Sequence, residues 1–120
     1  MNPTRHPLTL HDREQVAQSL AEQQAHRSSF NGSMREYYDA MTAQTPLAQG
    51  VRAEQIDASG WWLHPQATRS ERVIVFIHGG AYMLGSAKAY RGFASQLAVR
   101  TGYSTFVLDY PLAPEHPFPA

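Results

Sequence analysis

The stretch Arg72–Tyr82, RVIVFIHGGAY, decides the fold of this 120-residue chain. Its apolar run, residues 73–77, is typical of a strand buried on both faces of a parallel sheet. Gly79 and Gly80 then break the strand. Because α/β sheets bind ligands at the carboxyl ends of their strands, residues 78–82 form the candidate site. Two glycines let successive N–H groups face a developing oxyanion, although a pair of glycines after a strand is more often a tight strand–helix connection without chemistry.

The residues that follow this turn predict a strand–helix–strand unit. A helix is expected from about Ala87 to Thr101, with Gly102 where a C-terminal glycine belongs. Gly92 weakens this helix by up to about 1 kcal/mol relative to Ala. A second buried strand is expected over residues 104–109. The spacing predicts parallel strands with a right-handed crossover, followed by a proline-rich extended loop over residues 110–120.

The residues before the turn predict two helices and a β-hairpin. Residues 10–25 form the first helix, with Thr9 and Asp12 as a capping box. Ser33 and Glu36 cap the second helix, which ends at Thr45-Pro46. One face of that helix packs into the core or lines an apolar ligand pocket, and it carries Met34, Tyr37, Tyr38 and Met41. Residues 51–64 form the hairpin, with its turn at 58–60.

Composition excludes several classes of function. Ten Lys and Arg balance ten Asp and Glu, so no basic surface is expected for nucleic acid or for a membrane. The chain contains no cysteine, the five histidines other than His78 lack metal-ligand spacing, and no apolar run approaches a membrane span. The N-terminus has no secretory pattern, so a cytoplasmic location is expected.

Two motifs in order, HGGAYMLGS at residues 78–86 and DYPLAPEHPFPA at residues 109–120, carry a family resemblance. The chain resembles the hormone-sensitive-lipase-like branch of the α/β-hydrolase esterases. The resemblance implies an α/β fold class, a partial α/β-hydrolase fold with a mostly parallel sheet. Residues 1–46 would be the helical cap segment, and residues 47–120 the N-terminal part of the hydrolase domain. The resemblance implies the strand order 1-2-4-3-5-6, with residues 73–77 as strand 3. Without strand 5 these residues lie at an open edge, where a homo-oligomer could form.

The resemblance also implies site roles. The backbone N–H groups of Gly80 and Ala81 would form the oxyanion hole, Gly79 would shape the turn, and His78 would brace the loop without being the catalytic base. Ala81 stands where the family often has a third glycine, so a positive φ there would be strained. Three further residues would line the substrate pocket: Tyr82, Met34 and Tyr38. Glu115 resembles the family's loop carboxylate, which tethers neighbouring backbone.

The serines of this chain do not supply a nucleophile, since none of the nine lies in a G-x-S-x-G pattern. The resemblance therefore implies a carboxylic ester hydrolase, an esterase, lipase or lactone hydrolase, whose serine, acid and base lie beyond residue 120. Its substrate would be a small-molecule ester or lactone, without metal or organic cofactor. The 120 residues alone are expected to be inactive. The alternative is a catalytically inactive fragment that acts as a binding or dimerisation module.

Overall fold

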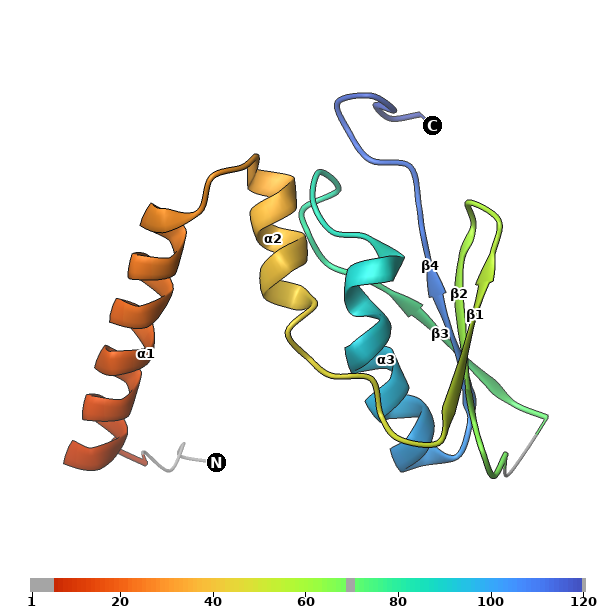
Figure 1. The fold of residues 1–120 in the computed structure, drawn as a ribbon, viewed down its shortest axis with the longest axis horizontal. Helices are drawn as coiled ribbons and strands as arrows, with labels where there is room; N and C mark the ends of the chain where they lie inside the picture. The colour runs from red at the N-terminus through yellow and green to blue at the C-terminus, as the bar shows by residue number, and fades with distance from the viewer. Residues whose placement is uncertain (1–5, 69–70, 120) are drawn as a thin grey trace, which may run out of the picture. The chain divides into compact units, whose positions relative to one another are not determined.

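The computed structural model describes residues 6–68 and 71–119, which form two compact units (Figure 1). The first unit comprises residues 1–32 and the second residues 33–120. This division groups the second helix with the sheet. The predicted cap boundary at residue 46 concerns the domains of a longer fold and stays a prediction.

The first unit is built around one helix, α1 (Leu10–Ser29). Thr9 and Asp12 form the predicted capping box, with each side chain bonded to the other residue's backbone N–H. The helix continues four residues beyond the expected end at residue 25, because Ser28 and Ser29 bond back to carbonyls of the preceding turn. None of its residues is buried. No described helix is both long and apolar enough to cross a lipid bilayer.

The second unit begins with α2 (Met34–Thr42). Ser33 and Glu36 form the capping box that the sequence predicts. The helix ends three residues before Thr45. Its last turn closes on itself, since the Thr42 hydroxyl donates to the carbonyl of Tyr38 and the Ala43 N–H donates to that of Asp39.

Four strands form one sheet in the order β1-β2-β4-β3 (Figure 1), as the resemblance implied. The predicted hairpin is confirmed as antiparallel β1 (Val51–Ile56) and β2 (Gly60–Pro65). β2 also pairs antiparallel with β4 (Ser104–Leu108), and β4 pairs parallel with β3 (Val73–Ile77). The parallel pair confirms the predicted strand–helix–strand unit and leaves β3 at an edge of the described sheet.

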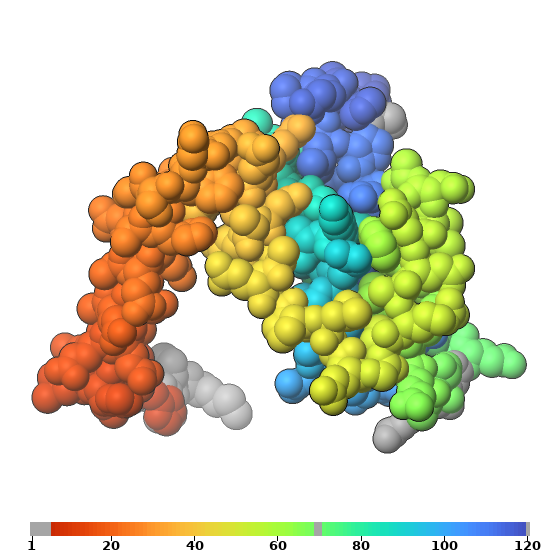
Figure 2. Space-filling model, viewed as in Figure 1, coloured from red at the N-terminus to blue at the C-terminus, as the bar shows by residue number. Residues whose placement is uncertain are grey.

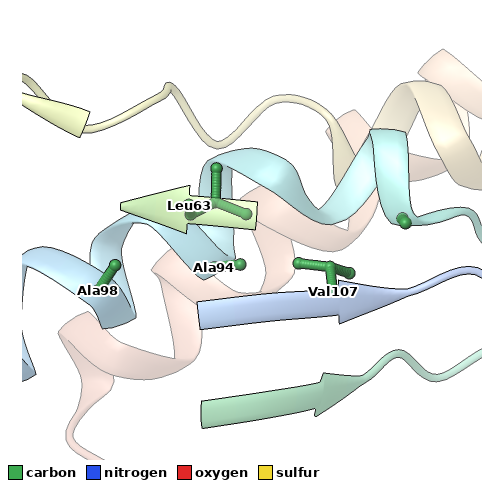
Figure 3. Packing of buried hydrophobic residues seen from close by; sticks show 5 residues of the cluster. Leu63, Ala94, Ala98 and Val107 are labelled. Carbon is green, nitrogen blue, oxygen red and sulfur yellow. The ribbon is translucent and has the colours of Figure 1, made fainter. Parts of the chain in front are cut away.

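Helix α3 (Ala87–Thr101) covers one face of this sheet. Gly102 ends the helix in the left-handed conformation, with φ 73°, and donates its N–H to the carbonyl of Ala98 at 2.8 Å. Small side chains on the helix allow close approach to the strands. Figure 3 shows the core between α3, β2 and β4, which comprises Leu63, Ala87, Ala94, Ala98 and Val107.

The prediction that β3 is buried on both faces is wrong. Only the face toward α3 is covered, where the ring of Phe76 packs against Tyr90 and Phe93. On the opposite face Val73, Val75 and Ile77 are 52%, 58% and 67% exposed. The apolar run is that of a two-sided interior strand, but no described segment covers its second face.

Candidate active site

The candidate site starts at His78, directly after β3. Its side chain is only 3% exposed and lies between the rings of Tyr90 and Tyr110, with centroids at 5.4 Å and 4.4 Å. Nδ1–H donates to the carbonyl of Gly79 at 2.9 Å, which assigns the proton to that nitrogen. The Tyr110 hydroxyl donates to the carbonyl of His78 at 2.7 Å. The ring is therefore held within the protein and is not presented to solvent.

The turn after His78 has three consecutive residues at positive φ. Gly80, Ala81 and Tyr82 have φ of 132°, 53° and 60°. The strain expected at Ala81 is present, and Tyr82 shares it. The carbonyl of Gly80 accepts the N–H groups of Met83 at 3.0 Å and Leu84 at 2.9 Å, which closes the turn.

Several carbonyls of this turn accept hydrogen bonds, whereas three of its N–H groups form none with the described residues. The carbonyl of Tyr82 accepts the Ala113 N–H at 2.9 Å, and that of Met83 accepts an arginine N–H. Within residues 6–68 and 71–119, the N–H groups of Gly80, Ala81 and Tyr82 form no hydrogen bond with another backbone group. Successive N–H groups in left-handed backbone form a concave anion site. Three unbonded N–H groups in succession match the donor pattern of such a site.

A pair of tyrosines lies beside Gly79. The hydroxyls of Tyr38, on α2, and Tyr90, on α3, are 2.9 Å apart. A Cβ added at Gly79 would lie 3.8 Å from each of them. Burial, together with the bond to Tyr38, raises the pKa of Tyr90 to about 12. Burial also raises the pKa of Tyr110, so both phenols stay protonated as donors at neutral pH.

The three residues expected to line a pocket differ in how closely the structure places them to the turn. Tyr38 reaches the turn through the hydroxyl pair, whereas Met34 and Tyr82 are largely exposed. Two hollows described in the structure lie elsewhere, one beside β1 and β2 and one between α3 and the segment after α2.

Polar contacts that sequence reasoning missed fix the start of α3 after the turn. Ser86 accepts the Ala89 N–H as N-cap, and its hydroxyl donates to Asp39 at 2.7 Å. Asp109, at the end of β4, accepts the Ala87 N–H at 2.9 Å. Asp109 thus caps the start of α3. The serine three residues before Ala89 was a local signal for this cap.

Arg35 was also missed, and no local signal could have found it, because its partners lie 48 to 80 residues away. It binds Glu115, whose carboxylate was expected to tether neighbouring backbone. The structure adds a partner to that expectation, since both carboxylate oxygens also accept from the guanidinium, at 3.0 Å and 2.7 Å.

Among the described residues, no group of three His, Asp or Glu side chains could hold a metal ion.

Comparisons with known proteins agree with this geometry. A family profile described as the α/β hydrolase fold matches residues 74–120. An esterase from Acinetobacter venetianus is 46% identical over 70 residues, which cover 58% of this chain and 20% of that esterase. Hormone-sensitive lipase from Mus musculus is 41% identical over 54 residues, or 45% of this chain and 7% of the lipase.

Solved structures extend the match to the fold. An esterase from the bacterial hormone-sensitive lipase family aligns with a TM-score of 0.71 at 27% identity, covering 95% of this chain and 39% of that one. The resemblance and the fold class predicted from the two motifs are confirmed. The chain spans about a fifth of the length of the Acinetobacter esterase.

Proposed function

We propose that this chain, which is similar to α/β-hydrolase fold esterases of the hormone-sensitive-lipase-like branch, supplies the oxyanion-holding turn of a serine carboxylic ester hydrolase. The N–H groups of Gly80 and Ala81 are the donors. His78 supports the turn by its hydrogen bond to the carbonyl of Gly79, and Gly79 lets the backbone turn sharply.

One observation carries the proposal: the free N–H groups of the turn stand among bonded carbonyls. Gly80, Ala81 and Tyr82 have no internal acceptor among the described residues, whereas the carbonyls of Gly80 and Tyr82 are taken. Strained backbone at Ala81 is retained only because the surrounding bonds enforce it. A plain strand–helix connection needs neither the strain nor the free donors.

In the proposed reaction, a serine supplied by residues outside this chain attacks the ester carbonyl. The carbonyl oxygen becomes negative in the tetrahedral intermediate and accepts the two N–H groups, each worth about 2.7–4 kcal/mol in the transition state. A histidine, also outside the chain, takes the serine proton and passes it to the leaving alcohol or ring oxygen. His78 takes no part in this transfer, since its ring is buried and stacked.

The substrate is proposed to be a small or medium apolar ester or a lactone. Tyr82, in the turn, and Met34, at the start of α2, are exposed, and the Tyr38 hydroxyl lies next to Gly79. Aromatic and thioether side chains suit apolar acyl or alcohol groups of varied shape. The reaction needs no metal or organic cofactor.

A fusion protein tests the proposal. Residues 1–120 are joined to the part of the Acinetobacter venetianus esterase that follows its matched segment. We expect the fusion to hydrolyse p-nitrophenyl butyrate, and exchange of the added nucleophilic serine for alanine to abolish the activity. The 120-residue chain alone should give no turnover above background. Serine-dependent turnover by the chain alone would contradict the assignment of the nucleophile.

The donor role is tested at Ala81 by a backbone change. Exchange of Ala81 for lactic acid replaces its N–H with an ester oxygen and keeps the side chain. We expect kcat of the fusion to fall about 10²–10³-fold with little change in KM. Ala81→Gly keeps the N–H and removes the strain, so it is the matched control and should retain activity. An unchanged kcat in the lactic acid variant would exclude Ala81 as a donor.

A second candidate function rests on a different observation, the exposed apolar face of β3. A chain with this face uncovered can act as a pairing module without catalysis. This second function would be supported if the fusion failed to hydrolyse esters while the 120-residue chain self-associated through β3.

A further inference from the structure

A single guanidinium joins three segments around the candidate turn. Arg35 is the second residue of α2, and its Nε donates to the carbonyl of Met83 at 2.7 Å. Its Nη2 donates to the carbonyl of Ala113 at 2.6 Å, and both Nη groups bind the carboxylate of Glu115. The helix, the turn and the C-terminal loop thus meet at one side chain.

The carboxylate fixes the plane of this guanidinium. A bidentate pair with a carboxylate leaves an arginine little rotational freedom, which a lysine cannot reproduce. The pair raises the pKa of Arg35 and lowers the pKa of Glu115, so both groups are charged at neutral pH. Both side chains are partly exposed, and an exposed ion pair alone contributes little stability. The ion pair matters because it orients the guanidinium, whose remaining N–H groups then donate to the carbonyls of Met83 and Ala113.

The carbonyls of Met83 and Ala113 both accept from Arg35, and a further hydrogen bond links Ala113 to the turn. Met83 belongs to the turn and is held directly by Arg35. Ala113 is held by Arg35 through its carbonyl and donates its own N–H to the carbonyl of Tyr82. Figure 2 shows the C-terminal loop, in blue, lying over the start of α3 and beside the start of α2. Arg35 therefore constrains the turn at Met83 and again, through Ala113, at Tyr82.

We propose that Arg35 is a positioning residue, which sets the direction of the free N–H groups of Gly80 and Ala81 by fixing the carbonyls of Tyr82 and Met83. The effect of Arg35 on catalysis rests on the proposed function. The structural content of the inference, that α2 controls the order of the turn through one side chain, is independent of any reaction. Capping of α2 by Ser33 and Glu36 places Arg35 at the helix start, where it faces both loops.

Amide hydrogen exchange tests the structural content, in the 120-residue chain and in the fusion. In Arg35→Met, we expect exchange to accelerate about tenfold at Leu84 and Ala113, whose N–H bonds close the turn. Arg35→Lys should behave almost as Met, because charge without the planar fork cannot hold both carbonyls. The matched control, Arg52→Met, removes an arginine that pairs with Glu54 on β1 and should leave these amides unchanged.

Three outcomes would overturn the inference. Unchanged exchange at Leu84 and Ala113 in Arg35→Met would show that Arg35 does not hold the turn in place. Equal acceleration across α3 would make Arg35 a general stabiliser. Wild-type exchange in Arg35→Lys would make charge, and not the fork, the cause.

Kinetics of the fusion test the catalytic meaning. We expect Arg35→Met to lower kcat for p-nitrophenyl butyrate about ten- to a hundredfold with a nearly constant KM, because misdirected donors weaken only the transition state. Arg52→Met should leave both constants unchanged. A rise in KM at constant kcat would overturn the positioning role. An inactive unaltered fusion would count against the proposed function alone, since the exchange data still decide the tether.

Discussion

The neighbouring glycines of the turn, Gly79 and Gly80, occupy different backbone environments. A Cβ added at Gly80 would lie 2.0 Å from the carbonyl oxygen of Leu84, and φ there is 132°. A Cβ added at Gly79 would meet only two tyrosine hydroxyls, at ordinary contact distance. Only Gly80 therefore requires the absence of a side chain.

This difference predicts opposite effects of one methyl group. Gly80→Ala should lower the free energy of unfolding by roughly 2 kcal/mol or more, because a clash adds to backbone strain. Gly79→Ala is the matched control and should change it by less than about 1 kcal/mol, with a small gain from a stiffer unfolded chain. Urea denaturation followed by circular dichroism measures both. Equal losses for the two variants would show that the turn does not have this geometry.

At the residue scale, the sequence predicted what depends on neighbours along the chain. The strain at Ala81, where φ is 53°, was implied by the resemblance, because the family often has a glycine at that position. The partner of Glu115 could not be predicted, because Arg35 is 80 residues away and only the folded chain brings the two together. The role of each as a site residue stays a proposal.

At the scale of elements, helix starts were predictable and burial was not. The two capping boxes use residues three apart, so Thr9 and Ser33 marked the starts of α1 and α2. The strand pattern also gave the hairpin and the parallel pair. Exposure of one face of β3 depends on which segments cover the sheet, and residues 73–77 carry no information about that.

Helix α3 contains a glycine that propensity alone misjudges. Gly92 lowers intrinsic helix stability by up to about 1 kcal/mol relative to alanine. In the structure, however, a Cβ there would lie 1.7 Å from the carbonyl oxygen of Thr45, in the segment that follows α2. Packing and propensity therefore favour different residues at this position.

We expect packing to win, so that Gly92→Ala destabilises the second unit by about 1–3 kcal/mol. The segment after α2 must move away from α3 to admit the methyl group. Thermal unfolding measures the effect, and Val99→Ala, at an exposed position of the same helix, serves as control. A gain of about 1 kcal/mol in Gly92→Ala, as propensity demands, would contradict the close approach of Thr45.

At the scale of the whole chain, the sheet of the second unit has one covered and one uncovered face. The uncovered face carries Val73, Val75 and Ile77 on the edge strand. Val75 is paired in register with Phe106 of β4, whose ring packs against Trp62 of β2, so the apolar surface continues across the sheet. An apolar face that ends in an unpaired edge strand favours association.

We therefore expect the 120-residue chain to self-associate with rising concentration, and Val75→Lys to suppress this by placing a charge in the centre of the apolar face. Val16→Lys is the matched control, because Val16 is similarly exposed but lies on α1 in the first unit. Size-exclusion chromatography with light scattering gives the mass of each variant. A cooperatively unfolding monomer at every concentration would contradict the expectation, and equal suppression by the two lysines would assign the effect to net charge and not to β3.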